Sequence, residues 1–247
     1  MDKRKPTVVV SSCLTGENVR YNGKVIKNQF VEKLKNYVNL ISVCPEVSIG
    51  LPTPRDKIVL VRENKSYKVY QPSTGIDFTQ KLTDFSFKFL ESLKDVDGFL
   101  LKSKSPSCGV SGTKCYKNKD GSGFIGRRRG IFAIETKKLF QNYPVEDELK
   151  LEDFLIKFEF LTKVYLIRYF KILDIEEFVE KYGRILNFYN KKRTKIFLKN
   201  PSLETLLKIF NVRLTEIRLK KYFKGKKIDF ELLKRDNLII FPDELLK

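Results

Sequence analysis

Three short apolar segments in the first half of the chain each lead into a cysteine-bearing loop that is rich in Ser, Gly and Pro. A short apolar run bounded by turn-forming residues is typical of a buried strand, and it is especially typical of a parallel sheet. We therefore predict three buried strands whose carboxyl ends carry the cysteines. The segments are Val8–Val10, 39–43 and 98–101, and they lead to Cys13, Cys44 and Cys108.

Between these segments, apolar residues recur at helical spacing over 27–37 and 79–93, where Phe85, Phe89 and Leu93 are four residues apart. Strands that alternate with helices indicate an α/β fold with a mostly parallel sheet and flanking helices. The carboxyl ends of such strands lie at one edge of the sheet, so we expect the three cysteine loops to meet there.

The pattern changes after about residue 145. Glycine becomes scarce, cysteine is absent, and apolar residues such as Phe154, Phe158 and Leu161 keep helical spacing. We predict an α/β domain over 1–145 and a smaller all-α domain over 146–247.

The amino-acid composition indicates the charge of a binding partner and excludes several classes of catalytic mechanism. The 247 residues include 49 Lys and Arg against 30 Asp and Glu, a net charge of +19, which favours a polyanionic partner. Histidine is absent, which excludes Ser-His-Asp hydrolysis, Cys-His proteolysis, His-ligated zinc and histidine general-base catalysis. We see no signal peptide and no apolar run of bilayer length, so we expect a cytoplasmic protein without membrane contact.

In a reducing compartment, four cysteines favour metal binding or catalysis over disulfides. Cys13, Cys44 and Cys108 are separated by 31 and 64 residues, so only the fold could assemble them into a site. Two sites remain open from the residues alone: a closed zinc site with Cys115 as the fourth ligand, or a 4Fe-4S cluster on three thiolates with one iron open to substrate. We favour the second and interpret Cys115 as a loop cysteine.

Three sequence blocks in the same order resemble the thiouracil desulfidase family. They are Ser11–Gly16 with Val19–Gly23, Cys44–Glu46 with Gly50–Arg55, and Leu101–Lys102 with Ser105–Gly109. The resemblance implies an α/β domain that carries a 4Fe-4S cluster on Cys13, Cys44 and Cys108. It also implies removal of sulfur from a thiolated pyrimidine as sulfide, without net redox change.

Glu46 is the carboxylate nearest in sequence to a cysteine ligand, so it is our candidate general base toward the attacking water and then general acid. Ser105 could orient the base edge or relay a proton, and the resemblance implies the same role. Arg20 and Arg55 either bind a phosphate or uracil O2 or form structural ion pairs. Asn22 stands where family members often have Asp, and it can make the same loop hydrogen bonds. The substrate-binding candidates are Ser12, Arg20, Tyr21, Asn22, Arg55 and Lys102.

The segment 143–148, followed by 154–170, resembles the junction in longer, fused family members, whose added helical domain is associated with desulfidation of 4-thiouridine in tRNA. Clusters of cations interleaved with aromatics support RNA binding, because cations contact phosphates and exposed aromatics stack on unpaired bases. The alternative is a solvated lysine-rich surface. The RNA-binding candidates are Arg127, Arg128, Arg129, Lys191, Lys192, Arg193, Lys220, Lys221, Lys226 and Lys227.

The sequence thus predicts a desulfidase that converts 4-thiouridine in tRNA, or in another thiolated RNA, to uridine at a 4Fe-4S cluster. The first alternative is the same reaction on free thiouracil or thiouridine. The second is a non-catalytic RNA-binding protein with a zinc site made from four cysteines.

Overall fold

The four strands of sheet A form the centre of the computed structural model, which describes residues 4–214 and 216–246. The strand order is β2-β1-β5-β8, and all neighbouring strands are parallel. The three strands predicted from the sequence are therefore confirmed, in one parallel sheet. The strands are β1 (Thr7–Ser11), β2 (Asn39–Val43), β5 (Gly98–Leu101) and β8 (Val145–Asp147).

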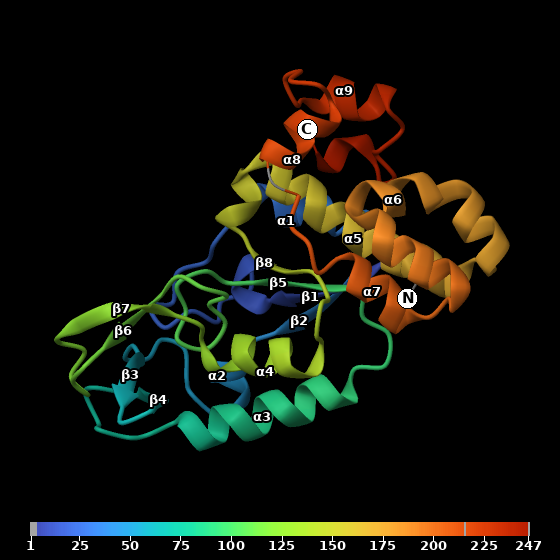
Figure 1. The fold of residues 1–247 in the computed structure, drawn as a ribbon. Coiled ribbons are helices and arrows are strands. Elements are labelled where there is room, and N and C mark those ends of the chain that lie inside the picture. Colours follow the sequence, from blue (N-terminus) through green and yellow to red (C-terminus); the bar gives the residue numbers. More distant parts are fainter. Residues whose placement is uncertain (1–3, 215, 247) are drawn as a thin grey trace.

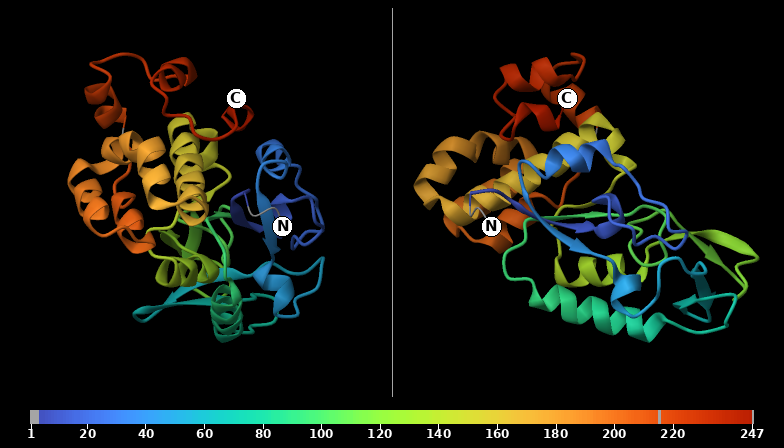
Figure 2. Two further views of the ribbon diagram at one scale, coloured as in Figure 1. Left: turned by 90° about the vertical axis from the view of Figure 1, so that its right-hand side faces the viewer. Right: turned by 180° about the vertical axis from the view of Figure 1, so that it is seen from behind.

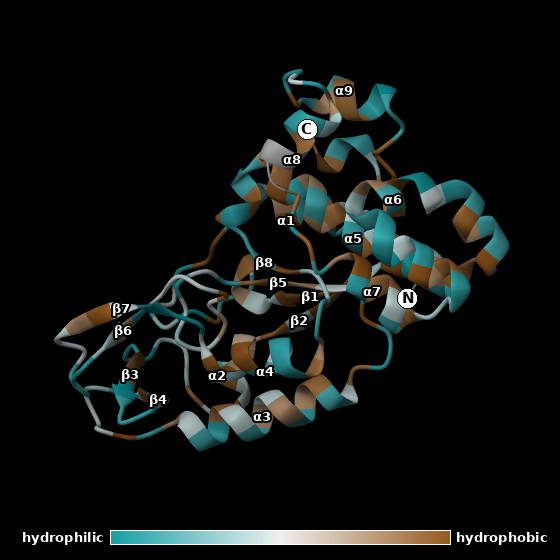
Figure 3. Ribbon diagram, viewed as in Figure 1, coloured by the Kyte–Doolittle hydropathy of each residue, from teal (hydrophilic) through white to brown (hydrophobic). Residues whose placement is uncertain are grey.

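Side-chain alternation divides the strands of sheet A between two cores. Val8 and Val10 of β1 pack with the C-terminal helices and α1, whereas Val9 packs on the opposite face with α3 and α4. Figures 1 and 2 show α5 and α3 on opposite sides of this sheet, and Figure 3 shows its strands as apolar segments. The α/β class with flanking helices is confirmed. The helices named here are α1 (Gln29–Leu34), α3 (Thr79–Ser92), α4 (Ile131–Leu139) and α5 (Phe154–Ile172).

A second sheet, sheet B, lies beyond the carboxyl edge of sheet A and was not predicted (Figure 1). Its order is β4-β3-β6-β7, with a parallel central pair and two antiparallel hairpins. Strand β3 shares an apolar run with Ile58, but β4 and β7 carry exposed polar residues and lack the continuous apolar runs of sheet A. They are β3 (Val59–Glu63), β4 (Ser66–Tyr70), β6 (Thr113–Tyr116) and β7 (Phe124–Arg128).

The remaining C-terminal helices continue from α5, as predicted for this region. Helix α6 is kinked at Asn190, whose side chain accepts the N–H of Arg193 and so caps the second half. Ser202 caps α7 with a reciprocal hydrogen bond to Thr205. The helices are α6 (Ile175–Lys199), α7 (Leu203–Ile209), α8 (Glu216–Tyr222) and α9 (Phe230–Arg235); the shorter elements are α2 (Pro45–Ser48), η1 (Ser12–Leu14), η2 (Lys150–Glu152) and η3 (Asp243–Leu245).

The helical region is tied to sheet A through buried charge. Arg168 of α5 donates to Asp97 from Nε at 2.9 Å and from Nη2 at 2.6 Å, and Asp97 also accepts the N–H of Thr7.

The predicted boundary between residues 145 and 146 falls within β8. The division into two domains stays a prediction, but the two parts share one hydrophobic core. No helix in the described part of the chain is long and apolar enough to cross a bilayer.

Candidate active site

The three predicted cysteine ligands meet at the carboxyl edge of sheet A. Cys13 lies in η1 directly after β1, Cys44 caps the start of α2 after β2, and Cys108 lies in the loop that follows β5. Because β2, β1 and β5 are neighbours, all three thiols line one cavity of about 400 Å³. The fold thus brings together residues that are 31 and 64 positions apart.

Burial dominates the acidity of these thiols. It raises the pKa of Cys13 to about 12, and the nearby Lys102 ammonium opposes this rise. Burial likewise raises the pKa of Cys44 and of Cys108, and neighbouring sulfurs of the set raise the pKa of Cys13 and of Cys108 further. Clustered sulfur ligands suit a thiophilic metal group, which has to displace the thiol protons when it binds.

Cys115 does not belong to this set. It lies in β6 rather than in a loop, is fully buried, and packs with Leu60 and Val69. A four-cysteine zinc site is therefore contradicted by the fold, and our interpretation of Cys115 as a loop cysteine is also wrong. Among the described residues, no group of three His, Cys, Asp or Glu side chains is arranged to hold a metal ion. Three thiols spread around one cavity fit a larger cluster better than a single ion.

Glu46 extends into the cavity from α2 and is held from two sides. Arg55 donates to its Oε2 from Nε at 3.1 Å and from Nη2 at 2.7 Å, and Ser107 donates its hydroxyl to Oε1 at 3.0 Å. The Arg55 guanidinium also donates from Nη1 to the carbonyls of Val19 and Pro52, each at 3.0 Å. Arg55 therefore forms the structural ion pair that the sequence analysis left open beside substrate binding, and it positions Glu46 in this structure.

Ser105 acts mainly on the backbone of the Cys108 loop. Its hydroxyl oxygen accepts the N–H of Ser107 at 3.1 Å and that of Cys108 at 3.0 Å, while its contact with Glu46 is longer, at 3.5 Å. Gly109 is required beside it, because a Cβ there would lie 2.7 Å from the Ser105 carbonyl oxygen. Ser107, which the sequence analysis did not single out, makes the closer contact with Glu46.

Lys102 lines the cavity, but its ammonium is already paired. It contacts Glu148 and donates to the Ser103 hydroxyl at 2.9 Å. Glu148 also accepts the backbone N–H of Ser103 at 2.7 Å, and its side chain is 8% exposed. The contact of Lys102 with substrate stays a prediction, and its partner Glu148 was missed. The acidic run that ends β8 was the available signal.

The other substrate-binding candidates divide into two groups. Ser12, Arg20 and Tyr21 line the cavity, so their contact with substrate stays a prediction, and Ser12 accepts a hydrogen bond from Ser42 at 2.8 Å. Asn22 does not line it. Its side chain accepts the N–H of Lys24 at 3.2 Å, so it makes the loop hydrogen bond and is not a substrate contact.

The cavity rim carries unpaired positive charge. Four cations there make no side-chain hydrogen bond or ion pair within the described residues, and Glu46 is the only carboxylate among the lining residues. Arg127 of β7 also lines the cavity and donates to the carbonyl of Gly112 at 3.1 Å. The four unpaired cations are Arg20, Lys57, Lys104 and Lys114.

The C-terminal basic clusters are exposed, but most of their aromatic neighbours are not. Phe188, Tyr189 and Phe223 are buried in the core, so our expectation that they could stack on bases is wrong. Tyr222 is 43% exposed and packs its ring edge-to-face with Phe188. The exposed cations of these clusters are Lys191, Lys192, Lys220, Lys221, Lys226 and Lys227. RNA binding by this region stays a prediction.

The chain is similar to known proteins over the part that contains this cavity. It is 32% identical over 160 residues to the uncharacterized protein YbbK of Bacillus subtilis, covering 60% of this chain and 99% of that protein. A solved structure described as the 4Fe-4S-dependent thiouracil desulfidase TudS matches with a TM-score of 0.46 and 28% identity, over 60% of this chain and 94% of that one.

The family comparison covers every residue of the site described above. A statistical model of the family described as 2-thiouracil desulfurase matches residues 8–148, from the first buried strand to Glu148, which is more than half of the chain. Cys13, Cys44 and Cys108 lie inside this range together with Glu46. By this match the chain belongs to the 2-thiouracil desulfurase family.

Proposed function

We propose that this protein removes sulfur from 4-thiouridine in RNA, with tRNA as the substrate class, and leaves uridine. The reaction is a hydrolysis: the ring C=S bond and water become C=O and hydrogen sulfide, with no net oxidation or reduction. The cytoplasm is the proposed site of this activity, because reducing conditions keep the cysteines as thiols.

Cys13, Cys44 and Cys108 would hold a 4Fe-4S cluster, since three soft thiolates around one cavity leave one iron without a protein ligand. When bound, this cluster supplies a Lewis-acidic iron for the thiocarbonyl sulfur. Cys115 takes no part, because it is buried in the core beside sheet B.

Glu46 carries the proton transfers. Its carboxylate lies in the cavity with its orientation fixed by Arg55 and Ser107, so it can accept a proton from water and return one to the departing sulfur. A fixed carboxylate loses little freedom on reaching the reactive arrangement, which lowers the entropic part of the barrier. Ser105 keeps the Cys108 loop in place while this occurs.

The observation that supports RNA over a free base is the cavity rim. Arg20, Lys57, Lys104 and Lys114 line the cavity and have no side-chain partner in the described part of the chain, and a neutral thiouracil offers no charge to pair with them. The negatively charged phosphodiester chain of an RNA can pair with these four cations. If the target base is stacked in folded RNA, it is flipped out of the stack into the cavity.

Anoxic protein with its cluster reconstituted tests this proposal. Loss of thiocarbonyl absorbance is followed with thiolated tRNA and with free 4-thiouracil, and Glu46→Gln serves as the matched inactive variant. We expect kcat/KM to be far higher for tRNA and to fall about 100-fold or more in Glu46→Gln. Turnover of the free base alone would overturn the RNA substrate. Absence of iron–sulfur absorption after reconstitution would overturn the proposal that the protein is a cluster-dependent enzyme.

A further inference from the structure

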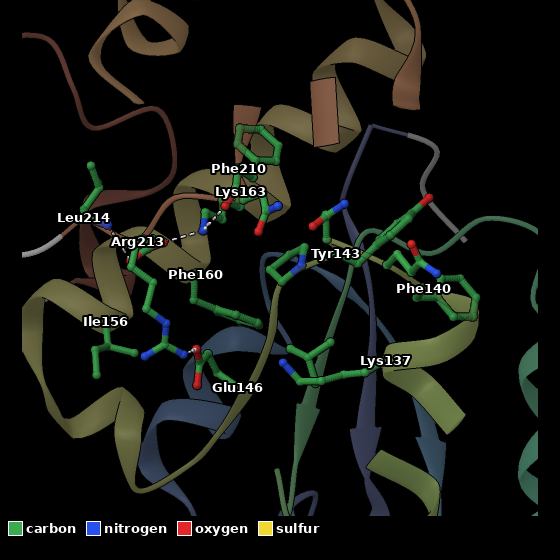
Figure 4. A pocket seen from close by; sticks show the side chains of 16 residues that line it. Lys137, Phe140, Tyr143, Glu146, Ile156, Phe160, Lys163, Phe210, Arg213 and Leu214 are labelled. Atoms are coloured by element: carbon green, nitrogen blue, oxygen red, sulfur yellow. Dashed lines mark hydrogen bonds and ion pairs between the residues drawn. The ribbon is translucent and has the colours of Figure 1, made fainter. Parts of the chain in front are cut away.

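A second cavity, of about 540 Å³, lies at the junction between the α/β part and the helical region. It is bounded by the end of α4, by β8, by α5 and by the segment that follows α7 (Figure 4). Figure 4 shows Lys137 and Arg213 reaching into it from different sides, with Glu146 between them. None of these residues belongs to the candidate active site.

The carboxylates of this junction cavity are already neutralised. Glu146 accepts a hydrogen bond from Arg213 at 2.9 Å and lies 3.5 Å from the Lys150 ammonium. Glu159 pairs with Lys163, which also donates to the carbonyl of Phe210 at 3.1 Å. Each of the two carboxylates thus has a cationic partner, although the buried Oε2 of Glu146 accepts no hydrogen bond from the described residues.

Lys137 is different, because its half-buried ammonium makes no hydrogen bond or ion pair within the described residues. Burial lowers its pKa, and Arg129, Arg213 and Lys150 lower it further, against the opposing effect of Glu146. A lysine surrounded by other cations gains most from an anionic ligand, and a phosphate group offers several acceptor oxygens.

One short segment connects the junction cavity with the active site. Arg127 lines the active-site cavity, whereas Arg129, two residues later, is close enough to Lys137 to repel its charge. Two residues of extended chain span about 6.5 Å. The basic cluster that the sequence analysis identified therefore extends from one cavity toward the other.

We infer that the junction cavity binds a backbone phosphate of the same RNA whose thiolated base enters the active-site cavity, through Lys137 supported by Arg129 and Arg213. The inference rests on the proposed function for the identity of the RNA. According to this inference, the junction between the two parts of the chain contacts the RNA backbone, in addition to the exposed lysines of the C-terminal helices.

The test measures binding of an unthiolated tRNA to the full-length, anoxically purified chain by fluorescence anisotropy at several salt concentrations. The variants are Lys137→Gln and the charge-conserving Lys137→Arg. Lys138→Gln is the matched control, since Lys138 is the next residue of α4 but is exposed and paired with Glu135. Inorganic phosphate is titrated into each protein separately. This binding assay requires no turnover, so it tests the inference even if the protein shows no desulfidase activity.

Lys137→Gln is expected to weaken tRNA binding about fivefold near physiological salt and to reduce the salt slope by about one. Lys137→Arg and Lys138→Gln are expected to bind as the wild type does. The melting temperature of Lys137→Gln should not fall, because an unpaired, half-buried cation is removed. Equal affinities for Lys137→Gln and Lys138→Gln would overturn the inference. So would phosphate binding that depends on Lys137 together with unchanged tRNA affinity, which would identify a site for free phosphate.

Discussion

Arg55 binds a single oxygen of Glu46 with two guanidinium nitrogens, and its third nitrogen is fixed by the carbonyls of Val19 and Pro52. The Arg55 side chain is only 3% exposed, so this arrangement is well shielded from water. The carboxylate cannot rotate without breaking contacts on both sides, because Ser107 holds the other oxygen. The residue proposed as the proton carrier is thus oriented before any substrate arrives.

Arg55→Lys should reduce turnover at least about tenfold, because one ammonium cannot replace the planar pair of donors that orients Glu46. Iron content should be unchanged, since no cysteine is touched. Kinetics with thiolated substrate and the iron–sulfur absorbance measure the two effects. Arg62→Lys on β3, an exposed position outside the cavity, controls for the substitution itself. Wild-type turnover in Arg55→Lys would show that the orientation of Glu46 is not needed.

Ser105→Ala and Ser107→Ala should have different effects although the two serines are neighbours. Ser105→Ala leaves two backbone N–H groups without their acceptor, so we expect a loss of about 1–2 kcal/mol in unfolding free energy and reduced iron content. Ser107→Ala removes only a hydrogen bond to Glu46, so we expect a severalfold lower kcat with normal iron content. Thermal unfolding, iron analysis and kinetics separate the two effects. Identical profiles for both variants would contradict the roles assigned here.

Replacement of any one of Cys13, Cys44 and Cys108 with Ala should abolish cluster assembly. The Cys115→Ala variant should still assemble the cluster. Cys115 is fully buried in an apolar cluster, so its truncation should cost about 1 kcal/mol of unfolding free energy. Iron and sulfide content after anoxic reconstitution, with circular dichroism to check folding, measures both outcomes. Loss of iron in Cys115→Ala with an intact fold would restore the four-cysteine site.

Stability should decline in acid partly through Asp95. Burial raises the pKa of Asp95, but hydrogen bonds from Arg168 and Lys171 outweigh it and leave the pKa below its ordinary value. The folded state therefore binds this proton less readily than the unfolded state, whose carboxyl has a pKa of about 3.9. The contribution of Asp95 is complete above that pH and is lost as pH falls below it.

We therefore expect the unfolding free energy of the wild type to fall more steeply than that of Asp95→Asn as the pH is lowered from about 4 to about 2.5. Urea titrations at several pH values measure the slopes. Asp84→Asn is the control and should keep the wild-type slope, because within the described residues this exposed carboxylate accepts from Gln80 alone and pairs with no cation. Parallel slopes for the wild type and Asp95→Asn would refute the linkage.

The sequence predicted the cysteine cavity because buried parallel strands have continuous apolar runs, as in β1 and β5, and because such strands end at a common edge. Sheet B was missed since β7 mixes Gly and Arg with exposed apolar residues, a pattern that periodicity does not separate from a loop.

The side-chain contacts within the site lay beyond sequence reasoning. Whether Ser105 or Ser107 donates to Glu46 depends on the turn that places their hydroxyls, and both occur in the same short block. The pairing of Lys102 with Glu148 joins residues 46 positions apart. Arg127 lines the active-site cavity, whereas Arg129 lowers the pKa of Lys137, and neither placement could be foreseen because β7 was not predicted.

The distribution of the three cysteines over β1, β2 and β5 also sets an order of events during biogenesis. No two of these thiols share a strand or a local loop, so a newly made chain presents them as isolated groups until the central strands have paired. Iron delivery must then follow folding. Once bound, the metal group would cross-link the loops that follow three adjacent strands and so stabilise the folded state. Oxidative loss of iron would therefore lower the stability of the fold.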